Sequence, residues 1–188
     1  STPIINMLIG FFMGISTGAG VVIAQFFGAG DLSKMKKAIH NSIALTLVIG
    51  VVLTVIGLVF NDPILKAIGV PNDVFSEAST YLSIYFWSLI FVMIYNMGSG
   101  ILRSVGDSKR PLYFLIFSSI INIVLDFLFV KNFGFGVAGA GYATLIAQAI
   151  SAIMVMYVLM KTEDSYKVVL KDIKFDKEIL LKIIKIGL

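Results

Sequence analysis

The chain contains 188 residues, of which 58% are hydrophobic and 14% are charged, whereas an average soluble domain is about 45–50% apolar and about 25% charged. The absence of cysteine excludes disulfides and thiolate metal sites, and a single histidine, His40, excludes a histidine-rich metal site. The formal net charge of +4 does not indicate a nucleic-acid partner, because the basic residues lie in short segments between long apolar blocks.

Five of these blocks are long enough to cross a bilayer, whose core of about 30 Å requires about 20 mostly apolar helical residues. In chain order, the predicted helices cover about residues 3–27, 38–60, 79–102, 111–130 and 136–160. Segments rich in glycine, proline, asparagine and aspartate separate the helices and mark their boundaries. The predicted fold class is therefore an all-α membrane protein with five transmembrane helices.

Residues 161–188 combine mixed charge with apolar side chains such as Val168 and Ile173. We predict a cytoplasmic linker, partly an amphipathic surface helix, that leads into the start of the next helix; a plain solvated loop is the alternative. The apolar pattern is already running at Pro3, and a new apolar pattern begins at Ile179. We therefore expect both ends of the chain to be cuts in a longer protein.

The basic residues predict the orientation in the membrane. When successive links are placed on alternate sides, 13 of the 15 lysines and arginines fall on one side, and the other side holds Lys66 and Lys131. The positive-inside rule assigns the basic side to the cytoplasm, so that Ser1 is outside and the residues after Lys161 are cytoplasmic. The 13 residues are Lys34, Lys36, Lys37, Arg103, Lys109, Arg110, Lys161, Lys167, Lys171, Lys174, Lys177, Lys182 and Lys185.

Three short motifs match enzyme signatures, but their contexts do not fit. Residues 134–139 have the G-x-G-x-x-G pattern without a preceding strand, and residues 14–18 have the G-x-S-x-G pattern in the middle of a predicted helix. Residues 28–31 have the G-x-G-D pattern of intramembrane aspartyl proteases, which need a second carboxylate at the same depth. We predict no catalytic residues and no enzymatic activity, and we interpret Gly10 with the glycines of residues 14–18 as a close-packing ridge.

Asp126 is the one acidic residue of the 11 that lies inside a predicted transmembrane helix. An aspartate at the centre of a bilayer costs about 2.5–3.5 kcal/mol, so it normally faces a cavity or a partner and marks an ion or substrate path. There it can hold a proton, because burial disfavours the charged form, or Na⁺, with the Asn122 carbonyl and the Thr144 hydroxyl as further oxygen ligands. The structural alternative is a hydrogen bond to a neighbouring helix, or a side chain that reaches outward to the boundary near Lys131.

Polar side chains on three predicted helices are spaced so that they can enclose a wet cavity. Ser118, Asn122 and Asp126 follow one another at intervals of four residues and form one stripe. The tyrosines of the third helix fit either a drug-contact face or an interfacial belt. The other polar positions are Thr144, Gln148 and Ser151 on the fifth helix, and Tyr81, Tyr85, Ser88, Tyr95, Asn96 and Ser99 on the third.

The sequence resembles the multidrug and toxic compound extrusion (MATE) family of secondary transporters over nearly its whole length. The resemblance rests on the order and spacing of four stretches and not on a single motif. They are residues 18–31 (GAGVVIAQFFGAGD), 100–111 (GILRSVGDSKRP), 122–126 (NIVLD) and 136–144 (GVAGAGYAT), the last continuing to Gln148.

The resemblance implies twelve helices in two lobes around a central cavity, of which this chain contains helices two to six of the first lobe and the linker to the second. It implies a cation-binding site formed by Asp126, Asn122 and Thr144, with a further aspartate from a first helix that is missing here. The family's polar residue on the fourth helix corresponds to Asn96 or Ser99. Tyr95, Ser118 and Gln148 complete the expected cavity lining.

The function that follows from the resemblance is antiport of H⁺ or Na⁺ against drugs or other amphipathic organic cations, by alternating access, in the cell inner membrane. The expected partners are a small organic substrate, the lipid bilayer and the remainder of the same chain, with no cofactor and no nucleic acid. One alternative is a lipid-linked oligosaccharide flippase of the same superfamily, which a cationic cavity would favour. Another alternative is a non-transporting membrane subunit.

Overall fold

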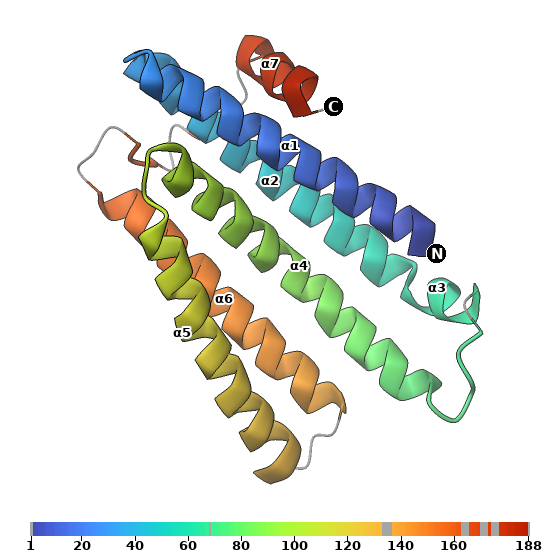
Figure 1. Cartoon of the computed structure of the whole chain (residues 1–188). Coiled ribbons are helices and arrows are strands. Elements are labelled where there is room, and N and C mark those ends of the chain that lie inside the picture. The colour runs from blue at the N-terminus through green and yellow to red at the C-terminus, as the bar shows by residue number, and fades with distance from the viewer. Residues whose placement is uncertain are drawn as a thin grey trace.

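The computed structural model describes residues 2–67, 69–132, 137–162, 166–169, 173 and 177–187. Within these residues every regular element is a helix, and the helices run back and forth along one another (Figure 1). In chain order they are α1 (Thr2–Gly28), α2 (Leu32–Val59), α3 (Asn61–Ala67), α4 (Phe75–Ser104), α5 (Lys109–Asp126), the π-helical segment η1 (Phe127–Asn132), α6 (Val137–Lys161) and α7 (Lys177–Gly187).

Five of the described helices are long and apolar enough to cross a membrane, which confirms the prediction of an all-helical membrane protein with five spans. Their ends differ from the predicted ones by a few residues. The second span was expected to begin at residue 38, but α2 begins at Leu32, because the Asp31 carboxylate accepts a hydrogen bond from the Lys34 amide (3.3 Å) and caps the helix. The lysine-rich turn before residue 38 is therefore helical and not a loop.

The short helix α3 was not predicted, and it fastens the end of α2 to α4. The Asn61 side chain is buried and donates from Nδ2 to the Ser79 carbonyl (2.9 Å) and to the Ser83 hydroxyl. Closer to the middle of the span, Thr54 donates from Oγ1 to the Phe86 carbonyl (3.2 Å). Each bond gives a buried polar group a partner on the neighbouring helix, which an apolar surrounding requires.

The α-helical hydrogen-bond pattern of α5 ends at Asp126 and continues as the π-helical segment η1. Single π-helical turns are rare and occur often at functional sites, because they rotate the side chains that follow. The fifth predicted helix was expected to begin at residue 136, which lies outside the described residues; α6 is described from Val137.

The most tightly packed part of the molecule lies at one end of the bundle. There α1, α2, α4, α6 and α7 contribute side chains to one buried cluster, and α7 packs against α1 and α2 (Figure 1). This is the end to which the sequence assigns the cytoplasm. The members include Ile15, Ala19, Val22, Ile23, Met35, Ile39, Ile43, Met97, Ile101, Leu102, Val155, Leu159, Val168, Ile179 and Ile183.

The chain that follows α6 is held against this end and is not a plain solvated loop where the structure describes it. Val168 is 1% exposed, and its amide donates to the Leu159 carbonyl (2.8 Å). The next amide, that of Val169, donates to Nε2 of His40 (3.1 Å), while Nδ1 of the same ring lies 2.6 Å from the Lys36 carbonyl. Since a carbonyl only accepts and an amide only donates, the ring carries its proton on Nδ1.

Helices pack closely at two glycines, Gly57 of α2 and Gly98 of α4. A Cβ atom built on Gly98 would overlap Val155 of α6, and one built on Gly57 would overlap the ring of Phe86. At Gly10, by contrast, a Cβ atom would meet open space within the described part of the chain. Small residues thus let α4 approach α6 and α2, whereas the ridge expected on α1 does not include Gly10.

Candidate functional site

The polar stripe of α5 lies on the side of that helix that packs into the bundle. Ser118 is 6% exposed and Asn122 and Asp126 are half-buried, whereas Ile120, Ile123 and many other apolar side chains of α5 are exposed. The helix therefore presents mostly apolar side chains outward and the three residues of the stripe toward its neighbours, chiefly α6. This is the arrangement that a polar helix face needs in a lipid environment.

Each residue of the stripe carries a buried oxygen without a hydrogen-bond partner in the structure. These atoms are Ser118 Oγ, Asn122 Oδ1 and Asp126 Oδ1. An unpartnered buried polar atom costs about 1–3 kcal/mol, and more if it is charged. Three such atoms lie at successive turns of one helix, and water, a bound proton or a cation could each supply a partner.

The π-helical segment begins directly after Asp126 and separates that carboxylate from the nearest basic side chain. Nζ of Lys131 lies over the ring of Phe127, 4.7 Å from its centroid, on the exposed side of the helix. In the described residues no ion pair joins Lys131 to Asp126. The geometry thus differs from the structural alternative in which Asp126 reaches outward to the membrane boundary near Lys131.

Thr144, on α6, is half-buried and uses its proton within its own helix, since Oγ1 donates to the Ala140 carbonyl (3.1 Å). Its oxygen keeps lone pairs that can accept a proton or coordinate a cation. At a rise of 1.5 Å per residue, Thr144 lies about 10 Å from the start of α6. Asp126 lies near the same end of the antiparallel helix α5 (Figure 1). Gln148, one turn further along α6, is also half-buried.

The polar residues of α4 do not share one environment. The Tyr95 hydroxyl donates to the Pro111 carbonyl (2.6 Å) and so fastens α4 to the start of α5. Ser99 is 1% exposed, and its Oγ has no partner in the structure. Asn96 lines a cavity between α4 and α1. Of the three expected lining residues of this helix, Asn96 contributes to this cavity.

That cavity, which we call the α1–α4 groove, has a volume of about 400 Å³. It contains residues that the sequence analysis treated as packing or topology residues. Arg103 was assigned to a basic link, and Ser16 and Thr17 were assigned to the interior of an apolar helix. The available signal was the adjacent pair of hydroxyl side chains, Ser16 and Thr17, inside an otherwise apolar helix. The lining residues are Met13, Ser16, Thr17, Gly20, Val21, Ala24, Asn96, Gly100, Arg103 and Ser104.

The side chains of the α5 stripe offer oxygen atoms as ligands. The described residues contain no group of three or more histidine, cysteine, aspartate or glutamate side chains that could hold a metal ion. One carboxylate with amide and hydroxyl oxygens can bind a proton, because a protonated carboxyl becomes a donor to the neighbouring oxygens. The same set can bind a hard monovalent cation, for which carbonyl and carboxylate oxygens are the usual ligands in transporters.

The sequence of the chain matches a known protein family and several of its members. The MatE family model matches residues 1–128. The chain is 35% identical to the probable multidrug resistance protein YoeA of Bacillus subtilis (strain 168), over 98% of this chain and 42% of that protein. It is 30% identical to the multidrug export protein MepA of Staphylococcus aureus (strain NCTC 8325 / PS 47), over 99% of this chain and 41% of that protein.

A solved structure agrees with these sequence matches. It is described as the inward-facing conformation of a multidrug resistance MATE family transporter of the MOP superfamily, and it superposes with a TM-score of 0.88 at 31% sequence identity. The match covers 98% of this chain and 42% of that chain, so the present chain spans less than half the length of the proteins it matches. The matches in sequence and in structure agree along almost all of the chain, and we conclude that it belongs to the MATE family.

Proposed function

We propose that this chain forms the first part of a cation-coupled exporter of drugs or other amphipathic organic cations. In this proposal Asp126, with Asn122 and the Thr144 hydroxyl, binds the coupling ion, which is H⁺ or Na⁺. The relatives named as multidrug resistance and multidrug export proteins support the class of substrate. The observation that carries the coupling role is the Asp126 carboxyl, which has a buried oxygen without a partner inside a transmembrane helix.

Binding of the ion can drive transport only if the ion binds one state of the transporter better than the other. A negatively charged Asp126 in a wet cavity is stable while water reaches it, and a neutralised Asp126 tolerates closure of the helices around it. The adjoining π-helical segment gives α5 a place to change its hydrogen-bond pattern, since α-helical and π-helical turns differ in register by one residue. Proton or Na⁺ exchange at Asp126 would thereby shift the balance between the outward-open and inward-open states.

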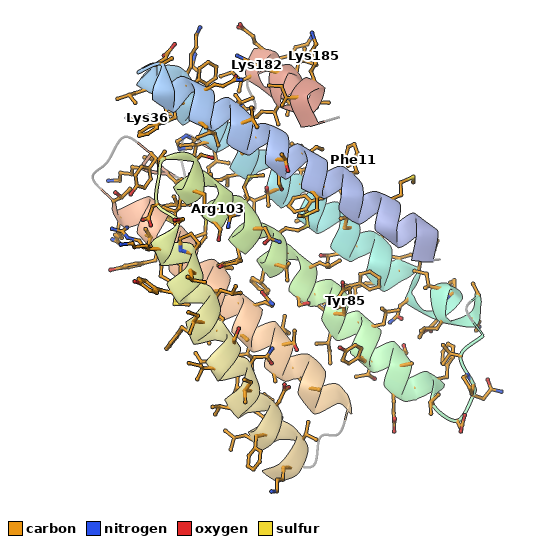
Figure 2. All side chains as sticks on the ribbon, in the orientation of Figure 1. Phe11, Lys36, Tyr85, Arg103, Lys182 and Lys185 are labelled. Atoms are coloured by element: carbon orange, nitrogen blue, oxygen red, sulfur yellow. The ribbon has the colours of Figure 1, made fainter. Side chains whose placement is uncertain are left out.

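We propose the orientation that the charge pattern predicts, with the densely packed end of the bundle and α7 in the cytoplasm. The basic side chains Lys36, Lys182 and Lys185 are labelled at this end of the molecule in Figure 2. The lysines and arginines of the described links follow the same division, with Lys66 and Lys131 at the opposite end. We also propose that the protein lies in the cell inner membrane, as its resemblance to MATE transporters implies.

The test is the substitution Asp126→Asn in the full-length protein, measured as efflux of a fluorescent cationic drug from cells and as ion-gradient-driven uptake into everted vesicles. Asparagine keeps the shape and one oxygen but neither binds a proton nor carries charge. We expect loss of gradient-dependent transport by about tenfold or more, within the usual 5–150-fold range of coupling effects.

Asp73→Asn is the matched control, because Asp73 is exposed in the turn before α4. The substitution removes the same charge from the same predicted side of the membrane. It should transport like the unmodified protein. Unchanged efflux and unchanged ion dependence in Asp126→Asn, at equal expression, would show that the coupling role is wrong.

A second candidate is the flippase of an anionic lipid-linked oligosaccharide. The observation that favours it is Arg103 in the α1–α4 groove, because a cationic cavity suits an anionic cargo. A flippase would be insensitive to the charge of Asp126 and sensitive to that of Arg103. Transport measured in Asp126→Asn therefore distinguishes the two candidates, because only the cation-coupled exporter depends on that charge.

A further inference from the structure

The α1–α4 groove is a polar feature separate from the stripe on α5. It runs beside α1 from Met13 to Ala24 and beside α4 from Asn96 to Ser104. At 1.5 Å per residue these stretches are about 16 Å and about 12 Å long. Because α1 ends at Gly28 and α4 ends at Ser104, the groove begins near mid-membrane and opens toward the predicted cytoplasmic end.

Polar side chains of the groove lie at the depth of the membrane core. Asn96, Ser16 and Thr17 lie within segments that are long and apolar enough to span a membrane, where lipid offers no hydrogen-bond partner. The Ser16 hydroxyl oxygen is buried and has no partner in the structure. Polar side chains at such a depth normally face water or another polar group and not lipid, so the groove is expected to hold water or a polar solute.

Small residues create the room in this groove. A Cβ atom on Gly100 would meet nothing within 4 Å. The Ser104 hydroxyl lies 3.1 Å from the Gly20 carbonyl and 2.7 Å from the Gly100 carbonyl, so it joins the two helices at the base of the groove. The Ser104 side chain thus bridges the backbones of α1 and α4, and the cavity of about 400 Å³ lies between these two packed helices.

The groove has one charged lining residue within the described chain, and it is a cation. Arg103 is exposed near the C-terminal end of α4 (Figure 2) and makes no ion pair in the described residues. The nearby Asp107 carboxylate is engaged by Arg110, with an Nε to Oδ2 distance of 3.3 Å. A guanidinium presents its donors in a planar fork that matches carboxylate, sulfonate and phosphate oxygens.

We propose that the α1–α4 groove binds the anionic group of an amphipathic organic solute. Arg103 pairs with the acidic group at the cytoplasmic mouth, and the Asn96 amide and the Thr17 and Ser16 hydroxyls contact the polar part that extends inward. This proposal rests on the proposed transport function, and it gives the acidic group of a zwitterionic or acidic cargo one site in the fold. It assigns two charged residues to different tasks, with Asp126 for the coupling ion and Arg103 for the cargo.

The test uses the full-length protein in a cysteine-free background with Thr17→Cys as a reporter in the groove. Inside-out vesicles are treated with the anionic sulfonatoethyl and the cationic trimethylammonium-ethyl methanethiosulfonates, and each rate is divided by that of a free small thiol. We expect the corrected rate to be at least about tenfold higher for the anionic reagent, because a nearby unpaired cation attracts one reagent and repels the other. The preference should disappear with Arg103→Gln and remain with Arg103→Lys.

A second measurement tests binding with dodecyl phosphate and dodecyltrimethylammonium as probes. Dodecyl phosphate should slow labelling of Thr17→Cys severalfold, and the cationic probe at the same concentration should not. Arg103→Gln should remove this protection. Val48→Cys, on the exposed apolar side of α2, is the control and should react with neither reagent.

Two results would overturn the proposal. Absence of labelling by both reagents at Thr17→Cys would show that other parts of the full-length chain fill the groove. Equal corrected rates, or equal protection by the two probes, would show that the groove has no preference for anions. Neither result would alter the effect of Asp126→Asn, and unchanged efflux in Asp126→Asn would not alter the labelling rates, so the two proposals fail separately.

Discussion

Gly98 is the position at which one added methyl group should disturb the bundle most directly. α4 packs more extensively against α6 than against any other described helix, and Gly98 lies in that interface. Its neighbours in the sequence, Met97 and Ser99, are 3% and 1% exposed. A Cβ atom at position 98 would overlap Cγ1 of Val155, which is itself fully buried. Gly98→Ala therefore forces either a rotation of the Val155 side chain or a separation of the two helices.

The magnitude follows from two opposing effects. Replacing a helical glycine by alanine gains about 0.5–1 kcal/mol through the lower backbone entropy of the unfolded chain. Inserting a methyl group into a well-packed interface costs about 1–3 kcal/mol. Because Val155 is fully buried and its Cγ1 atom lies where the new methyl group would be placed, the second effect should win, and we expect the free energy of unfolding to fall by about 1–2 kcal/mol.

The assay is unfolding of the purified full-length protein by sodium dodecyl sulfate, followed by far-ultraviolet circular dichroism. Gly100→Ala is the matched control, since it lies in the same helix two residues away and its added Cβ atom meets nothing within 4 Å; it should be neutral or slightly stabilising. The double variant Gly98→Ala with Val155→Ala removes the colliding atom and should recover about 1–2 kcal/mol relative to the sum of the single variants. Equal stabilities of Gly98→Ala and Gly100→Ala would refute the packing argument.

Two other contacts give further predictions. His40→Phe keeps the bulk of the ring but removes the acceptor for the Val169 amide. Hydrogen exchange at the Val169 amide should therefore accelerate about five- to tenfold, as expected for loss of a bond worth about 1 kcal/mol. Unchanged exchange would mean that Val168 alone holds the linker against the bundle. Asn61→Ala removes the donor to the Ser79 carbonyl and the Ser83 hydroxyl, and the free energy of unfolding should fall by about 1–3 kcal/mol, the sum of two bonds of about 0.5–1.5 kcal/mol each. Asn72→Ala, at an exposed position in the turn before α4, should be neutral in the same measurement, and an equal effect of both would show that Asn61 is no anchor.

The number of spans, their approximate ends and the family are properties that the sequence alone determined. Each depends on local quantities: the length of an apolar block relative to the bilayer thickness, the glycine and proline turns, and the order of short motifs. The stripe of Ser118, Asn122 and Asp126 could likewise be identified from a spacing of four residues, because that spacing fixes a common helix face wherever the helix packs.

The tertiary structure decided which of the polar residues share an environment. It separated Tyr95, which is bonded to Pro111, from Asn96, which lines the α1–α4 groove beside Arg103. It also revealed the π-helical segment after Asp126, the anchor at His40 and the contact of Gly98 with Val155. These features depend on the rotation and separation of helices that are distant in sequence. Helix propensity and hydropathy are local, and they do not contain the interhelical distances on which those contacts depend.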